Sequence, residues 1–220
     1  YDRRLGDIFA LEDDITEHVT LALQVKLTEG EQARIRRGHT DNPEAYEYFL
    51  RGLEVFRTFT KEANAQARKL FEKAAELDPN YAHVWQTIGR SYYRDARFGW
   101  TDTPAASLAH AEELAQKTLA VDDSDAAAYA LLSLVYMTRR QHDEAVAYAE
   151  KALSLAPNFA DVQAMLALPF LYSGRPEEAI ELVKSAMRLS PYYPAWYLPV
   201  LGHAYRLTGQ YKEAIALLEI

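Results

Sequence analysis

Pairs of alanines recur along this chain at a fixed spacing, and each pair is followed by a proline. Ala145 and Ala152 precede Pro157, and the same pattern returns 34 positions later, ending at Pro191. Seven residues make about two turns of an α-helix, so the paired alanines share one helix face. Small side chains on that face let a neighbouring helix approach closely, and the proline ends the helix. The spacing therefore predicts a series of short helices that pack against one another.

A second helical pattern precedes each alanine pair. At 85–92 it reads W-x-x-I-G-x-x-Y, which places a large ring, an aliphatic side chain, a small residue and another ring on one stripe. Gly89 is the small residue in this copy, and Ser133 and Gly202 hold the same position in later copies. We expect the two helices of each pair to cross at this small residue.

Together, the two patterns resemble the tetratricopeptide repeat (TPR), a helix–turn–helix unit with W-x-x-L-G-x-x-Y, then A-x-x-x-F-x-x-A, then proline. The resemblance covers about residues 45–220. It implies an all-α fold: a right-handed TPR superhelix, or α-solenoid, of about five helix–turn–helix repeats, preceded by an N-terminal amphipathic helix. We divide the chain into an N-terminal helical linker at 1–42 and a TPR array at 43–220. The expected units are about 45–81, 82–125, 126–159, 160–193 and 195–220.

Several residues depart from the TPR pattern. The inter-helix connection of the first unit is about three residues longer than the pattern, and the second unit carries about ten extra residues around ARFGWTDTPA. Thr118 stands where alanine is expected, and Asp123 where proline is expected. Pro169 falls in mid-helix and Pro199 early in a helix. We expect these two prolines either to kink the groove wall, freeing the Met165 carbonyl for water or ligand, or to be tolerated irregularities.

The first forty residues have their own helical signals. Residues 7–27 read as one amphipathic helix, and a shorter helix begins near Thr28 and stops at Gly38. Asn42 and Pro43 are predicted to be the N-cap and the first residue of the next helix. YDRRLGDIFALEDDI, running into DNPEAYEYFLRGLEVF, resembles a region of bacterial multidomain signalling proteins. There it links a class III adenylate/guanylate cyclase domain, or a winged-helix regulator with a TolB-like segment, to TPR repeats.

Composition excludes several functional classes. Lys and Arg total 24 against 32 Asp and Glu, a net charge of −8, which argues against nucleic-acid binding by this segment. The chain has no cysteine, so it can form neither a disulfide nor a thiolate metal site, and this suits a cytoplasmic location. The longest apolar run, 126–137, is too short to cross a bilayer, so we expect no membrane partner. The six histidines have no metal-ligand spacing, and no phosphate loop or catalytic triad is recognisable. We therefore expect no catalytic residue, metal or cofactor.

The concave side of a TPR superhelix is the expected binding surface, because the first helix of each unit lines it. Its predicted residues form a largely apolar and aromatic stripe with several arginines: Tyr46, Phe49, Leu53, Phe56, Arg57, His83, Gln86, Arg90, Tyr93, Arg94, Leu134, Met137, Leu168, Leu171, Trp196, His203 and Arg206. This combination favours an extended or helical peptide that carries apolar anchors and a carboxylate. The alternative is that part of the stripe packs within the superhelix.

Three functions are compatible with these features. The leading hypothesis is a non-enzymatic scaffold that binds a protein or peptide partner and acts as a regulatory or docking part of a larger bacterial signalling protein. In the second, the chain is the regulatory C-terminal region of an adenylate/guanylate cyclase whose catalytic domain lies upstream. The third is a self-association module that forms a homodimer.

Overall fold

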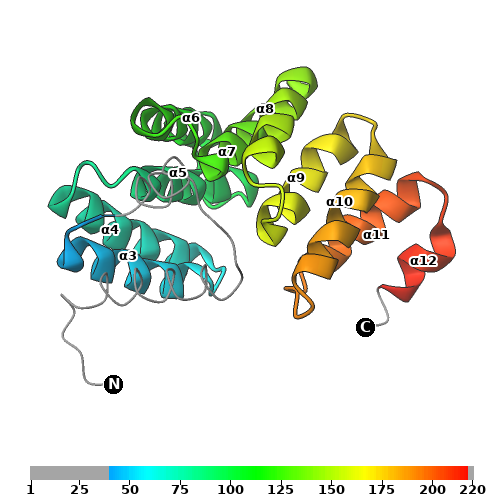
Figure 1. Ribbon diagram of the computed structural model, residues 1–220, viewed down its shortest axis with the longest axis horizontal. Coiled ribbons are helices and arrows are strands. Elements are labelled where there is room, and N and C mark those ends of the chain that lie inside the picture. The colour runs from blue at the N-terminus through cyan, green and yellow to red at the C-terminus, as the bar shows by residue number, and fades with distance from the viewer. Residues whose placement is uncertain (1–39, 218–220) are drawn as a thin grey trace, which may run out of the picture.

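The structure, a computed structural model, describes residues 40–217 of the chain, and within them it contains ten α-helices and no β-strand. The helices carry the labels α3 to α12 in Figure 1. The predicted helix at 7–27 and the shorter one that stops at Gly38 lie outside the described residues.

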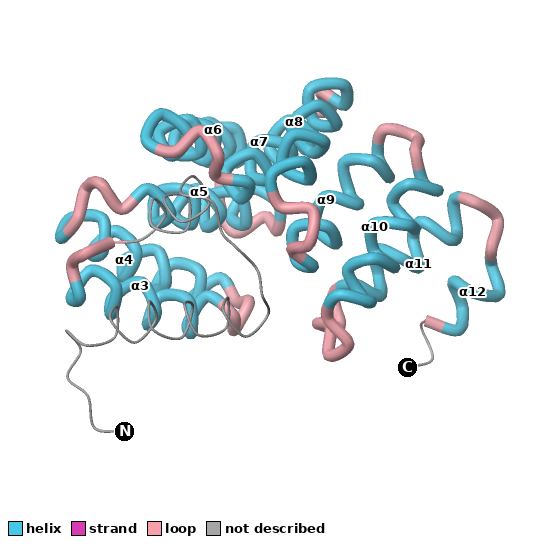
Figure 2. Tube along the Cα trace, viewed as in Figure 1, coloured by secondary structure: helices cyan, strands magenta, loops and turns pink. Residues whose placement is uncertain are grey.

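The ten helices follow one another as five helical hairpins. Their bounds are α3 (Pro43–Phe56) with α4 (Lys61–Leu77), α5 (Ala82–Arg97) with α6 (Pro104–Val121), α7 (Ala126–Thr138) with α8 (His142–Leu155), α9 (Ala160–Tyr172) with α10 (Pro176–Leu189), and α11 (Tyr197–Leu207) with α12 (Tyr211–Ala216). Figure 1 shows the hairpins placed along an arch, with α7 and α8 near its top and α3 and α12 toward its two ends. Figure 2 shows that short loops join all of them. The predicted all-α solenoid is confirmed.

The first helices of the hairpins lie on the inner side of this arch. α5 packs against α7, α7 against α9 and α9 against α11, in addition to the contacts that each makes with its own partner. The second helices have no comparable contacts with one another in the described residues. Neighbouring elements are closest on the inside of a curve, so α5, α7, α9 and α11 form the concave wall.

Small residues stand where the helices of a hairpin cross, as predicted. A Cβ atom on Gly52 would collide with the ring of Phe71 on α4. A Cβ atom on Gly89 would lie 2.7 Å from Leu131 Cδ2 and 3.1 Å from the Ala111 carbonyl oxygen. Gly89 therefore admits both its own partner helix and the first helix of the next hairpin.

In later hairpins the helices leave more space at the crossing residue. Ser133 fits at the crossing because its Oγ donates a hydrogen bond of 2.6 Å to the Ala145 carbonyl oxygen. At Gly202 an added Cβ would approach the Ala214 carbonyl oxygen only to 3.9 Å, which is an ordinary contact distance. The crossing of α11 and α12 is thus looser than that of α5 and α6.

Four of the five first helices, α5, α7, α9 and α11, end with a common backbone motif. The N–H groups of Trp100, Gln141, Arg175 and Gln210 donate to carbonyl oxygens five residues earlier, and the residue before each has a positive φ. This is the Schellman motif, in which the left-handed residue is usually glycine because it has no Cβ. Glycine fills that position after α5, α9 and α11, but after α7 it is Arg140, with φ of 63°.

The second helices end at the predicted places. α4, α8 and α10 each end two residues before the proline at 79, 157 or 191. The second hairpin lacks this proline, and in its turn Asp122 Oδ1 accepts from the Ser124 N–H at 3.0 Å and from its hydroxyl at 2.6 Å. Asp78 Oδ1, beside Pro79, accepts from the Asn80 N–H at 2.9 Å in the same way. Thr118 is buried at the expected alanine position because its hydroxyl donates to the Ala82 carbonyl oxygen at 3.2 Å.

The prolines inside first helices are accommodated differently. Pro199 is the third residue of α11, and residues of a first turn have no intrahelical acceptor for their N–H groups. It therefore removes no backbone hydrogen bond and needs no kink. Pro169 is buried within α9, which continues to Tyr172. The proposed freeing of the Met165 carbonyl stays a prediction.

Gly89 and Gly202 allow a matched test of the crossing. Gly89→Ala should lower the free energy of unfolding by about 1–2 kcal/mol, because overpacking outweighs the better helix propensity of alanine. Gly202→Ala meets no close atom and should raise it by about 0.5–1 kcal/mol. Guanidinium denaturation followed by circular dichroism measures both. Equal effects at the two sites would contradict the close approach at Gly89.

Arg140 offers a test of the turn. Its side chain is exposed, and an L-residue in the left-handed region is destabilised by about 1–2 kcal/mol. Arg140→Gly should therefore raise the free energy of unfolding by about 0.5–1 kcal/mol, after the entropy of the unfolded glycine is allowed for. Arg140→Ala, which removes the same side chain but keeps a Cβ, is the control and should produce no gain.

Candidate functional site

The structure divides the predicted binding stripe into two groups. Seven of its side chains are buried in the core: Phe49, Phe56, Gln86, Tyr93, Leu134, Met137 and Leu171. The other ten are exposed or half-buried: Tyr46, Leu53, Arg57, His83, Arg90, Arg94, Leu168, Trp196, His203 and Arg206. The alternative that part of the stripe packs within the superhelix therefore applies to the first group.

The buried group supports the wall instead of lining it. The ring of Phe49 lies 5.7 Å from that of Phe71 on α4 and 5.2 Å from that of Tyr81, both between centroids. Leu134 and Met137 belong to the core cluster that α7 shares with α6 and α8. Because successive first helices touch one another, the neighbouring hairpin covers these positions. For these seven residues the alternative reading of the stripe, packing within the superhelix, describes the structure.

Two arginines of α5, Arg90 and Arg94, stand out among the accessible residues. They are one helical turn apart on the inner wall, and both are half-buried. Arg94 Nη1 donates to the Phe56 carbonyl oxygen at 2.7 Å, and its guanidinium carbon lies 3.4 Å from the centroid of the Phe56 ring. The guanidinium carbon of Arg90 lies 5.8 Å from the same centroid. α3 and α5 thus hold the pair against an aromatic floor.

Neither arginine forms an ion pair with any carboxylate in residues 40–217. Burial lowers the pKa of Arg90, and the charge of Asp161 on α9 partly opposes this. Burial also lowers the pKa of Arg94, and repulsion from Arg90 adds to the effect. Guanidinium groups nevertheless remain cations at neutral pH. The wall therefore holds two adjacent, partly desolvated positive charges.

The opposite part of the wall comes from α9 and α11. The Tyr197 hydroxyl donates to Asp161 Oδ1 at 2.7 Å, so the carboxylate whose charge acts on Arg90 already has a partner. The centroids of the Tyr172 and His203 rings are 5.9 Å apart, edge to face. Burial and the charge of Arg206 lower the pKa of His203, which favours the neutral ring at pH 7.

Tyr172 is a residue that the sequence-based stripe missed. It is the last residue of α9 and is 44% exposed. It lies one position beyond Leu171, which was predicted but is buried. A large aromatic residue at the end of a helix was the sequence feature that could have indicated it. The orientation of α9 in the assembled array, however, determines which of the two adjacent residues is exposed.

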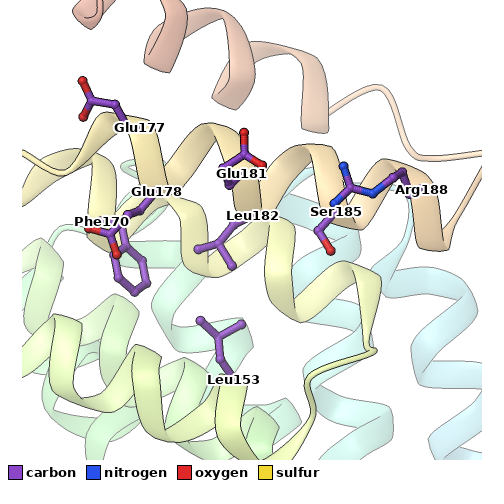
Figure 3. Close-up of a pocket in the computed structure, with 8 residues that line it drawn as sticks. All are labelled: Leu153, Phe170, Glu177, Glu178, Glu181, Leu182, Ser185 and Arg188. Carbon is purple, nitrogen blue, oxygen red and sulfur yellow. The ribbon is translucent and has the colours of Figure 1, made fainter.

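A shallow hollow of about 520 Å³ lies away from this wall, between α8 and α10. Figure 3 shows Leu153 of α8 and Leu182 of α10 pointing toward one another across it, with Phe170 of α9 beside them. Glu177 and Glu181 point away from the apolar floor. No sequence pattern indicated the hollow, because it forms between second helices of successive hairpins.

Among the described residues, no group of His, Asp and Glu side chains has the arrangement of a metal site. None of the helices in the same part of the chain combines the length and apolarity that a membrane crossing needs.

Known proteins share this repeat and this fold. Two family profiles, both described as tetratricopeptide repeat, match residues 126–159 and 170–220. A thermophilic TPR protein of Thermus thermophilus superposes with a TM-score of 0.63 at 19% identity, covering 79% of this chain and 87% of that one. PilF of Pseudomonas aeruginosa gives a TM-score of 0.56 at 19% identity, covering 80% and 74% of the two chains. At such identities these structures show the fold alone.

A sequence relative belongs to a longer protein. Putative adenylate cyclase 3 of Rhizobium meliloti (strain 1021) is 34% identical over 146 residues, which make up 66% of this chain and 25% of the relative. The chain thus spans a quarter of the length of that relative.

The helical hairpins and their crossings agree with the two profile matches that this is a TPR array, and TPR arrays are protein-interaction scaffolds rather than enzymes. The chain carries tetratricopeptide repeats at 126–159 and 170–220, and its described part folds as a tetratricopeptide-repeat solenoid.

Proposed function

We propose that the concave wall binds a protein segment that presents a carboxylate, and that Arg90 and Arg94 receive it. The observation that carries this proposal is the pairing of two half-buried arginines that have no carboxylate partner among residues 40–217. A partly buried charge without a partner costs folding free energy, and a bound anion offsets that cost. Carboxylates outnumber cationic side chains in this chain, whose net charge is −8, so two arginines without a carboxylate partner in residues 40–217 are unexpected.

The geometry suits a carboxylate better than a neutral group. Among residues 40–217, Arg94 donates a side-chain hydrogen bond through Nη1 to the Phe56 carbonyl oxygen, so its other N–H donors remain available there for a planar, two-oxygen acceptor. Hydrogen bonds to a charged partner contribute about 1.5–3 kcal/mol each. The accessible Leu53, Leu168 and Trp196 supply apolar contacts for the rest of the segment. Assignment of these residues to a binding groove stays a proposal.

Binding can be tested with a peptide array that varies acidic and apolar positions, followed by fluorescence anisotropy on the best binder. The double change Arg90→Gln/Arg94→Gln should weaken binding at least tenfold, since two charge-assisted hydrogen bonds are lost. Arg140→Gln, the same change on an exposed turn, is the control and should leave the affinity unchanged. Equal affinity of the double variant and the control would refute the role of the arginine pair.

A stability comparison tests whether Arg90 is retained for binding. Arg90→Met keeps the aliphatic stem and removes an unpaired charge, so the free energy of unfolding should stay the same or rise by about 0.5–1 kcal/mol. Arg68→Met breaks the bond between the Arg68 Nη2 and Asp95 Oδ2 at 2.5 Å and should lower it by about 2–4 kcal/mol. Chemical denaturation of both variants gives the answer. A large loss for Arg90→Met would mean that the residue is structural.

A second proposal places this array in a signalling protein, as the regulatory C-terminal region of an adenylate cyclase. The 34% identity to a putative adenylate cyclase supports it, together with the N-terminal sequence that resembles the linker of such proteins. The test is cyclic-AMP formation by the full-length gene product, with and without residues 43–220. If the full-length product makes no cyclic AMP, or if the deletion leaves the rate unchanged, this proposal fails.

Three further sequence predictions stay as proposals: a homodimer, a cytoplasmic location and the absence of nucleic-acid binding. Light scattering over a range of protein concentrations tests the first.

A further inference from the structure

A cluster of aromatic rings lies where the α3–α4 connection meets the α5–α6 connection. Residues 57–60 join α3 to α4 and residues 98–103 join α5 to α6, whereas the later hairpins use only 139–141, 173–175 and 208–210. The first and second connections are thus one and three residues longer than the later ones, whereas the sequence predicted about three extra residues for the first. The two connections bring together Phe59, Phe98 and Trp100, which we call the loop cluster.

The three rings contact one another in pairs. Their centroids are 5.0 Å apart for Phe59 and Phe98, 5.9 Å for Phe59 and Trp100, and 5.3 Å for Phe98 and Trp100. Contact among them does not remove them from solvent: Phe59 remains 49% exposed and Phe98 45% exposed. Large apolar side chains gathered at the surface in this way are typical of an interaction site.

The loop cluster is held in place by the core. The Trp100 N–H donates to the Asp95 carbonyl oxygen at 2.9 Å. The Asp95 side chain is buried and accepts from Asn64 Nδ2 at 2.8 Å and from Arg68 Nη2 at 2.5 Å, both on α4. Phe59 has φ of 58°, in the left-handed region that glycine occupies more easily. A bulky ring kept in that conformation, and half exposed, points to a role other than packing.

Part of the extra length of the second hairpin extends its helices and does not enter the loop. α5 has 16 residues and α6 has 18, against 13 and 14 for α7 and α8. The remaining extra residues lie in the connection itself, which has six residues at 98–103 against three at 139–141.

The charged side chains beside the loop cluster determine which kind of ligand it can bind. The guanidinium carbon of Arg94 lies 4.6 Å from the Phe59 centroid, and that of Arg97 lies 5.8 Å from the Phe98 centroid. Three rings could in principle form a cage for a cation, but two arginines already lie over them and would repel another positive charge. Arg97, like Arg94, has no ion-pair partner in the described part of the chain.

From these contacts we infer that the loop cluster docks an acidic peptide segment of a partner protein, with an apolar side chain on the rings and an adjacent carboxylate on Arg97. The rings provide apolar area at low entropic cost, and the arginine provides a charged hydrogen bond. This surface goes beyond the proposed groove function, because its rings lie on the connections and not on the concave wall.

The fluorescence of Trp100 allows binding at the loop cluster to be measured. In the full 220-residue chain, Trp85→Phe and Trp196→Phe leave Trp100 as the only tryptophan. The probe is a synthetic nonapeptide, Gly-Ser-Asp-Phe-Glu-Leu-Asp-Gly-Ser, titrated against this chain. A second peptide with Asn and Gln in place of the acids is the matched probe. We expect the emission of Trp100 to change saturably with the acidic probe and at least tenfold more weakly with the neutral one.

Phe59→Gly separates binding from folding. Glycine is suited to the left-handed conformation, so the variant should be as stable as the parent or more stable, yet bind the acidic probe at least tenfold more weakly. Arg140→Gly, the same kind of change in another turn, should bind normally. Arg97→Gln should weaken binding of the acidic probe only, and Arg140→Gln, the same change on an exposed turn, should leave it unchanged. Because the signal is the emission of Trp100, it reports on the loop cluster, so failure here is distinguishable from failure of the groove, which Arg90→Gln/Arg94→Gln tests.

Four outcomes would overturn the inference. They are no change in Trp100 emission with the acidic probe, equal binding by Phe59→Gly, a clear loss of stability in Phe59→Gly, and tighter binding of an oligothymidine strand than of the peptide. The third would show that the ring is part of the core, and the fourth would assign the surface to stacked bases.

Discussion

Each helical hairpin of this chain leaves an apolar face that only the next hairpin can cover. Gly89 shows the requirement most clearly, because its missing side chain makes room both for α6 and for Leu131 of the following hairpin. Cores built in this way are shared between units, so stability is distributed along the array. The contacts between successive hairpins also set the curvature of the array, since first helices approach one another more closely than second helices do. The stacking of one hairpin on the next therefore produces both the shared core and the concave wall.

Features with a local backbone or steric cause could be predicted from the sequence. The prolines after α4, α8 and α10 mark helix ends because they cannot continue a helix. Asn42 caps α3 as predicted, and its side chain accepts from the N–H groups of Glu44 and Ala45. Where the proline is missing, the chain still turns, and Asp122 accepts from a backbone N–H there as Asp78 does in the first hairpin. A pattern read residue by residue does not reveal such a shared hydrogen bond.

The candidate site was less predictable because exposure depends on the neighbouring hairpin. Phe49 and Leu134 hold stripe positions, but rings and aliphatic groups at those positions are covered by the next first helix. Leu171 and Tyr172 are adjacent on α9, and the orientation of that helix buries the first side chain and exposes the second. The long connections were visible in the sequence as extra residues, yet nothing in the residue order showed that Phe59 and Phe98 would meet. Contacts of that kind arise only from the assembled array.

The distribution of arginine partners connects stability with function in this fold. Arg68 is paired with Asp95, Arg139 with Glu112, and Arg175 with both Glu150 and Glu178. Three of these four pairs join residues 25 or 27 positions apart in the sequence, so carboxylates do pair with structural cations elsewhere in the array. Arg90, Arg94 and Arg97 lie on one helix and form no ion pair within residues 40–217. Their guanidinium groups lie beside aromatic rings, and these cation–π contacts offset part of the desolvation of Arg90 and Arg94. Asp161 on α9 is the acid whose charge acts on Arg90, but its carboxylate accepts a hydrogen bond from Tyr197 and forms no ion pair with the arginine. We therefore propose that the anion which these cations receive arrives with a partner.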